Sequence, residues 1–159
     1  MKIELDVRTE ETVRIYFEKS QNPIIKKMLP QKAQSVEEAL EDYRETLLST
    51  ATSYGRIIRV DGEYVGDVWC YCIDADEEPN AMLSYCVFEE KCWNKGIATK
   101  AVALFIEEMK ARFQVKTVGA FFFSENQASR KVLEKNGFVF VEEFEEDAVM
   151  SQYYQRSIY

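Results

Sequence analysis

The sequence contains no histidine among its 159 residues. This absence removes the usual general base, the usual activator of a nucleophile and the commonest metal ligand. Any chemistry must therefore rely on positioning, backbone hydrogen bonds, carboxylates, hydroxyls or tyrosine. Positive charge is also scarce, because 20 lysines and arginines stand against 28 acidic residues, a net charge of −8. A general nucleic-acid-binding protein would show the opposite balance, so we expect no nucleic-acid partner.

Long apolar runs are missing as well. No run approaches the length of a membrane-spanning helix, and the first residues lack the apolar core of a signal peptide. We therefore expect a cytoplasmic protein with no membrane association, folded as one domain over residues 1–159. The few cysteines, Cys70, Cys72, Cys86 and Cys92, agree with a reducing compartment. Cys70 and Cys72 are expected on one face of a strand, and free thiols are favoured over a zinc site.

Apolar periodicity predicts the order of strands and helices. Strands are predicted at residues 3–7, 56–60, 64–73, 81–88, 115–123, 138–141 and 149–157, and helices at residues 9–19, 35–47, 97–111 and 126–136. Asp61-Gly62 between two apolar runs is a strong hairpin signal. Prolines are expected to break the chain at Asn22-Pro23 and Leu29-Pro30, and the acidic run at residues 142–147 to separate the last two strands. This order predicts an α/β fold, with a mixed sheet flanked by helices.

A compact polar turn precedes the longest predicted helix. Residues 81–88 are typical of a buried strand, and Trp93-Asn94-Lys95-Gly96 then leads into a helix that starts at Ile97. Asn94 tolerates left-handed backbone geometry, and Gly96 lets the backbone approach a ligand closely. The first four amides of a helix have no internal partner, and the helix dipole adds positive character there. This arrangement favours a phosphate site, although many helices with such an entry bind nothing.

Two blocks of sequence carry a family resemblance. The block Trp93-Asn94-Lys95-Gly96-Ile97-Ala98-Thr99 resembles the acyl-CoA pyrophosphate loop of the GCN5-related N-acetyltransferases. That family's pattern is Arg or Gln, two residues, Gly, one residue, and Gly or Ala. A tryptophan in the first place is similar to the branch that acetylates the N-termini of ribosomal proteins. The second block, residues 126–138 with the sequence NQASRKVLEKNGF, resembles the second cofactor motif of the same branch.

The resemblance implies both a fold and a co-substrate. The fold is a mostly antiparallel sheet with one splayed parallel pair, and the co-substrate is acetyl-CoA, with no metal. The pantetheine arm would lie between the strands at residues 81–88 and 115–123, aligned by backbone groups of Cys86, Val87 and Phe88. An N–H group there would face the thioester carbonyl. The pyrophosphate would bind the amides of Trp93, Asn94, Lys95, Gly96, Ile97, Ala98 and Thr99.

The second block supplies the candidate catalytic residues. By resemblance, Asn126 would bond the pantetheine arm, and the hydroxyl of Ser129 would protonate the departing thiolate. Each residue also has a purely structural interpretation, since Asn126 is a good helix N-cap and Ser129 is a small residue in a helix. Lys135, with Arg130 and Lys131, adds positive charge that the cofactor could meet.

Two groups that relatives use are missing from this chain. Many members of the wider family place a tyrosine acid where Leu133 stands, and the ribosomal-protein branch often has a glutamate aligned with Met82. Methionine cannot accept a proton, so the base is unassigned. Asp67, Tyr85 and Glu143 are only expected to lie nearby. Another group, a chain of waters or an amine that arrives neutral must serve instead.

These features predict an acetyl-CoA-dependent N-acetyltransferase that acts on a primary amine by direct transfer in a ternary complex. A protein N-terminus is one candidate acceptor. The alternatives are an enzyme for small amines such as polyamines or aminoglycosides, and a catalytically silent acyl-CoA-binding module. Both a monomer and a homodimer remain open.

Overall fold

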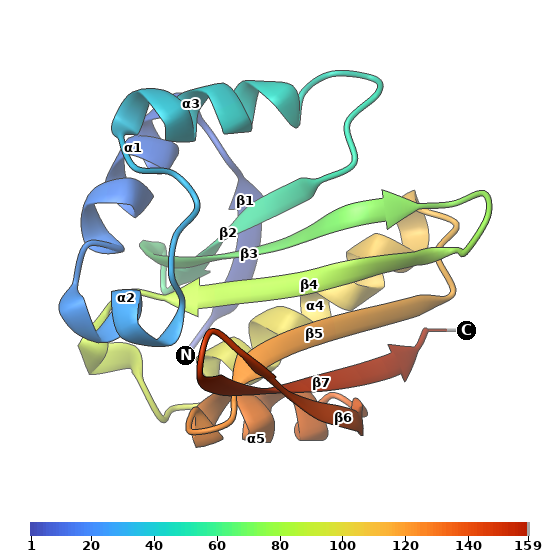
Figure 1. The fold of residues 1–159 in the computed structure, drawn as a ribbon. Coiled ribbons are helices and arrows are strands. Elements are labelled where there is room, and N and C mark those ends of the chain that lie inside the picture. Colours follow the sequence, from blue (N-terminus) through green and yellow to red (C-terminus); the bar gives the residue numbers. More distant parts are fainter. Residues whose placement is uncertain (159) are drawn as a thin grey trace.

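A seven-stranded mixed sheet forms the centre of the computed structural model, which describes residues 1–158 (Figure 1). The strand order is β1-β2-β3-β4-β5-β7-β6, and neighbours are antiparallel except for β4 and β5. The strands are β1 (Ile3–Val7), β2 (Tyr54–Val60), β3 (Glu63–Asp74), β4 (Asn80–Val87), β5 (Thr117–Phe123), β6 (Val139–Glu146) and β7 (Val149–Ser157). The helices are α1 (Glu10–Lys19), α2 (Pro23–Met28), α3 (Val36–Glu45), α4 (Ile97–Arg112) and α5 (Gln127–Lys135), with a 3₁₀ turn, η1, at Glu90–Cys92. The predicted α/β class is confirmed.

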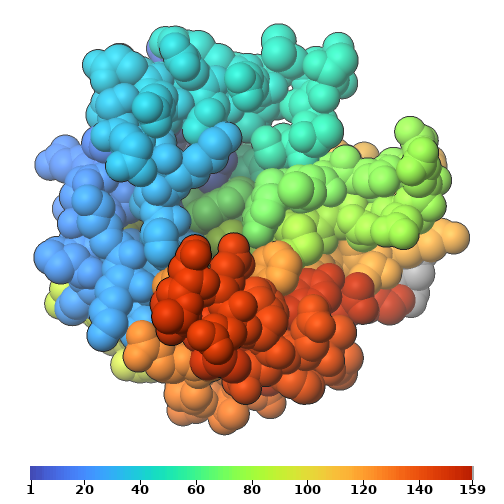
Figure 2. All heavy atoms as spheres, in the orientation of Figure 1, coloured from blue at the N-terminus to red at the C-terminus, as the bar shows by residue number. Residues whose placement is uncertain are grey.

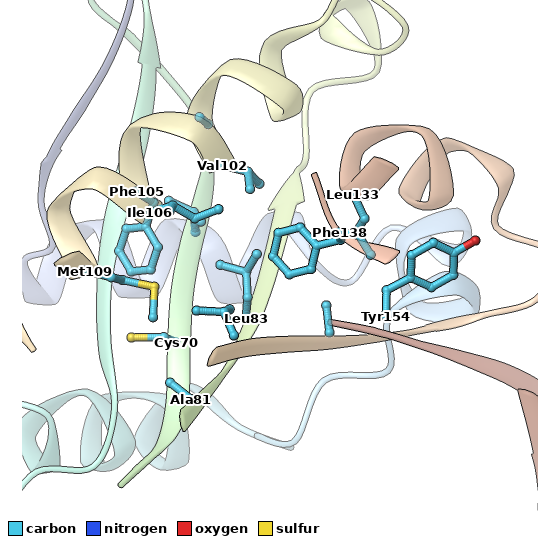
Figure 3. Packing of buried hydrophobic residues seen from close by; sticks show 14 of the residues in the cluster. Cys70, Ala81, Leu83, Val102, Phe105, Ile106, Met109, Leu133, Phe138 and Tyr154 are labelled. Atoms are coloured by element: carbon cyan, nitrogen blue, oxygen red, sulfur yellow. The ribbon is translucent and has the colours of Figure 1, made fainter. Parts of the chain in front are cut away.

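Helices cover both faces of the sheet, and each face has its own apolar cluster. On one face, α4 buries Phe105, Ile106 and Met109 completely against the strands (Figure 3). On the other face, Ile25 of α2 packs with Cys86 and Phe88 at the end of β4. Burial of one such large side chain contributes about 1.5–3 kcal/mol, so both clusters help to hold the end of β4 in place.

The parallel pair β4–β5 opens part of the way along its length. Its register runs from Asn80 opposite Thr117 to Met82 opposite Gly119. Beyond Met82, β4 continues to Val87 while β5 stays paired with β7, and no further register pair joins β4 to β5 in the described chain. The two strands therefore diverge towards the end of β4 that faces α2 (Figure 1). The splayed pair expected from the sequence is confirmed.

The turn and helix-cap signals of the sequence are also seen in the structure. Asp61 and Gly62 join β2 to β3 with φ values of 50° and 85°, the left-handed geometry that a two-residue hairpin turn requires. Ser35 caps α3 by accepting a hydrogen bond from the Glu38 amide at 3.2 Å. The Glu38 carboxylate accepts from the Gln34 amide rather than from Ser35, so only half of a capping box forms there.

Two parts of the chain take a course that was not predicted. Helices do end before Pro23 and before Pro30, but the stretch between these breaks is the short helix α2 rather than a loop, because proline is tolerated in a first helical turn and Asn22 accepts from the Ile24 amide at 2.8 Å. The acidic run does not separate the last two strands. It forms most of β6, and the hairpin turn comes later, at Asp147 and Ala148, whose φ values are 51° and 64°. The charges are acceptable on this edge strand because nearly all of its residues are exposed to water.

Three side chains lie elsewhere than the apolar pattern predicts. Leu47 follows the end of α3 and is 66% exposed, and Val7 at the end of β1 is 55% exposed. Cys70 is buried but Cys72 is exposed, with a φ of 52° at the point where the β3–β4 register shifts. The two cysteines therefore do not share a strand face.

Candidate active site

The turn between β4 and α4 has the backbone geometry expected of an anion site. Asn94 and Gly96 both lie in the left-handed region, with φ values of 60° and 78°. Gly96 is the N-cap of α4 and offers no side chain to the helix amides, and the first turn of α4 contains no acidic residue. The amides that start α4 are therefore available to an anion, which the helix dipole also favours.

Trp93 fixes this turn to the end of β4. Its indole Nε1 donates a hydrogen bond to the Val87 carbonyl at 2.7 Å, and its ring packs near the smaller apolar cluster. The Val87 carbonyl is therefore already engaged within the protein. Nearby, Lys91 is engaged elsewhere, because its ammonium bonds Glu63 at 3.0 Å and this hydrogen bond raises the lysine pKa.

The N-terminus of α5 brings the second motif to the same place. The Asn126 side-chain oxygen accepts from the Ser129 amide at 3.2 Å, which confirms the predicted cap. Only the amide nitrogen of Asn126 is then left to donate to a ligand. The Ser129 carbonyl accepts from the Tyr85 hydroxyl at 3.4 Å, and a hydrogen bond with the Ser129 side chain acts to lower the Tyr85 pKa. Burial raises the pKa of Tyr85 to about 12, so the phenol stays protonated.

One cavity of about 530 Å³ joins these parts. Its predicted lining residues are Cys86, Val87, Trp93, Asn94, Gly96, Ile97, Ala98, Thr99, Asn126, Ser129 and Lys135. Two predicted residues do not line it. Phe88 turns its ring into the smaller cluster and its amide donates to the Val65 carbonyl at 2.9 Å, and Lys95 projects from the exposed turn.

The sequence prediction missed one wall of the cavity. Ile24, Ile25, Met28 and Leu29 close it from the side of α2. Their spacing of one, three and four residues is a helical signal, but the flanking prolines concealed it. Tyr85 was also missed as a lining residue, although its strand position beside Cys86 and Val87 could have suggested it.

No aspartate or glutamate among residues 1–158 lines this cavity. Met82 stands opposite Gly119 at the point where the parallel pair opens. Asp67 is 2% exposed and bonds the Arg8 guanidinium at 2.9 Å, while burial raises its pKa. Glu143 lies on β6, where it accepts from Ser124 at 3.0 Å. Leu133 is 1% exposed and lies in the main core (Figure 3).

The described residues contain no group of three side chains suited to hold a metal ion. Among the same residues, no helix is both long and apolar enough to cross a bilayer. The sheet has a parallel pair that opens above a helix N-terminus, and beside it lies a cavity that suits an extended anionic ligand. Together these features define the class of acyl-CoA-dependent N-acyltransferases. The sequence comparison agrees, because the family model described as "Acetyltransferase (GNAT) domain" matches residues 5–139. The chain belongs to this GNAT acetyltransferase family.

Solved structures share the fold at low sequence identity. A spermidine N-acetyltransferase from Vibrio cholerae, in complex with CoA and spermine, has a TM-score of 0.86 at 13% identity, covering 98% of this chain and 95% of that one. The ribosomal L7/L12 alpha-N-protein acetyltransferase RimL, in complex with CoA, has a TM-score of 0.83 at 19% identity, covering 99% and 94%. The aminoglycoside acetyltransferase AAC(6')-Ib, in complex with CoA, gives 0.82 at 16%, covering 98% and 95%. No curated protein sequence matches significantly.

Proposed function

We propose that this protein is an acetyl-CoA-dependent N-acetyltransferase that moves an acetyl group directly to a primary amine. The observation that carries the proposal is the cavity of about 530 Å³, in which the turn before α4, the end of β4 and the start of α5 face one another. The family match over residues 5–139 supports the same reaction. So does the presence of CoA in the complexes of similar fold.

The residues present fit the cofactor. The uncapped amides at the start of α4 would take the pyrophosphate, since the space around the Gly96 Cα is open and no carboxylate stands in the first helical turn. Lys135 lines the same cavity and would add positive charge. The amide nitrogen of Asn126 and the backbone of Cys86 and Val87 would hold the pantetheine arm.

In direct transfer the amine nitrogen attacks the thioester carbonyl carbon, the carbon–sulfur bond breaks, and its electron pair goes to sulfur. Holding the two reactants in line supplies on the order of 7–11 kcal/mol of the barrier in favourable cases. The Ser129 hydroxyl is proposed to deliver a proton to the thiolate. The proton that leaves nitrogen has no carboxylate acceptor at Met82, so the amine is proposed to arrive neutral.

The acceptor would enter from the face opposite α4. Figure 2 shows this face hollowed over β3 and β4, between the segment that follows α2 and the β6–β7 hairpin. The acidic strand β6 borders the hollow, and the five carboxylates at residues 142–147, four on β6 and one in the turn that follows, form no ion pair within the described chain. Their charge would attract an amine in its protonated form and raise its local concentration, and the amine would lose that proton to water before it reaches the thioester. The four free cysteines support a cytoplasmic setting.

A thiol-release assay tests the proposal. Purified protein with acetyl-CoA should release CoA thiol when offered an amine, and the panel should include peptides with free N-termini, a polyamine and an aminoglycoside. The acceptor with the highest kcat/KM identifies the substrate class. If acetyl-CoA binds but no amine in a broad panel is acetylated, a silent binding module is the correct description instead.

A further inference from the structure

The side chain of Tyr85 lies where the proposed function places the reactive end of the cofactor. An inference about this residue rests on that proposed function and goes one step beyond it. If the phosphates sit on the turn at residues 93–99, the pantetheine arm runs back along β4 towards the opening of the parallel pair. The β4 residues that line the cavity are Val87, Cys86 and Tyr85, in that order from the turn. Tyr85 is therefore the innermost of them, and the next residue, Ser84, lies outside the lining.

The hydroxyl of Tyr85 points across the opening to α5. It donates to the Ser129 carbonyl at 3.4 Å, close to the outer limit of a hydrogen bond, and a hydrogen bond with the Ser129 side chain partly offsets the burial that raises its pKa. A hydrogen bond of that length is weak, so little is lost if the phenol turns to a better acceptor. A thiolate in the cavity would be such an acceptor, since bonds to charged groups are about twice as strong as neutral ones.

We propose that Tyr85 is a catalytic residue whose phenol donates a hydrogen bond to the cofactor sulfur as negative charge develops on it. The carbon–sulfur bond breaks, the electron pair stays on sulfur, and the phenol O–H stabilises that charge. The proton that completes the thiol comes from the attacking nitrogen, through Ser129 or solvent, and Tyr85 keeps its own.

The acid strength of the two groups explains this division of roles. Burial raises the pKa of Tyr85 to about 12, whereas an alkyl thiol titrates near 8.5. Transfer of the phenolic proton to the thiolate would therefore be uphill, but a hydrogen bond to the thiolate is favourable. Among residues 1–158 no second phenol lines the cavity, and Leu133 is 1% exposed in the core and carries no polar atom.

The thiol pKa of bound CoA tests the proposal without any acceptor. The thiolate absorbs near 240 nm, and the complex with desulfo-CoA, which lacks the sulfur, serves as the blank for the protein's own cysteines and tyrosines. In the wild type the bound thiol should titrate below free CoA. Tyr85→Phe keeps the ring and removes only the hydroxyl, so it should raise the bound thiol pKa by about one unit or more, a tenfold change in the thiolate equilibrium.

Two further variants separate direct contact from an indirect effect. Tyr71→Phe removes a partly buried phenol from β3 that does not line the cavity, and it should leave the bound thiol pKa unchanged. In a Ser129→Ala background, Tyr85→Phe should still raise the pKa if the phenol meets sulfur itself. The proposal is overturned if Tyr85→Phe leaves the thiol pKa at the wild-type value, or if its effect disappears in the Ser129→Ala background. A protein that fails to bind CoA at all would instead refute the proposed function.

Discussion

Two glycines in equivalent backbone conformations allow a controlled test of the phosphate site. Gly96 has a φ of 78° and Gly62 a φ of 85°, and a Cβ built at either position meets nothing within 4 Å. Aspartate at either position therefore meets the same left-handed strain, which costs roughly 1–2 kcal/mol. Only Gly96→Asp places a carboxylate where the pyrophosphate is proposed to bind. Two unit charges about 4 Å apart near a protein surface repel by about 4 kcal/mol, which corresponds to a loss of affinity on the order of 10²–10³-fold.

Thermal unfolding with and without acetyl-CoA measures the difference. At a ligand concentration about 100 times the dissociation constant, binding stabilises the native state by about 2.7 kcal/mol. For a chain of this length that corresponds to an increase in Tm of about 5–11 °C. Gly62→Asp should keep this increase although its unliganded Tm is lower, and Gly96→Asp should lose most of it. An equal ligand-induced shift in both variants would refute the placement of the phosphates at the turn, and so would the loss of the shift in both.

The remaining predictions concern the second motif, the acceptor and the thiols. Asn126→Ala should weaken acetyl-CoA binding and cost about 1 kcal/mol of stability by removing a helix cap, which thermal unfolding with and without acetyl-CoA measures. Ser129→Ala should lower kcat ~10²-fold with little change in KM, which steady-state kinetics measures. Because the chain has no histidine, kcat/KM should rise from about pH 6 to 9 with the neutral fraction of the amine, and a shared break near pH 6–7 for two amines of different pKa would contradict this. At pH 8, iodoacetamide should label exposed Cys72 quickly and Cys86 slowly, since burial raises the Cys86 pKa to about 12, and mass spectrometry reports the order.

The cofactor side of the molecule could be predicted because its signals are local. Asn94 and Gly96 adopt left-handed geometry for reasons contained in those residues, and Asn126 caps its helix through an amide three residues away. The pairing between β4 and β5 is not local. The family resemblance predicted that this pair splays, but the end of the pairing at Met82 and Gly119 was not predicted, since strand periodicity alone gives no information on where a pair opens.

The α2 wall and the course of β6 could not be predicted, because neither has a local signal in the sequence. A helix of six residues is too short to show a full apolar period, and Ile25 is helical largely because it packs against Cys86 and Phe88. In β6 the charged run resembles a loop, and what makes it a strand is its pairing with β7, which begins after the turn at Asp147. Both features depend on contacts that form only in the folded chain.

The same difference between local and distant contacts distinguishes the proposed site for acetyl-CoA from the proposed site for the amine. The cavity proposed for the donor is built largely from two short stretches, residues 85–99 and 126–135, with one wall from α2. Its proposed ligands are mostly backbone groups, which substitutions do not remove. The hollow proposed for the acceptor is bordered by residues from both ends of the chain, after α2 and along β6 (Figure 2). Its charge depends on side chains, so the same donor site is compatible with many acceptors, and side chains around the hollow must decide which amine reacts.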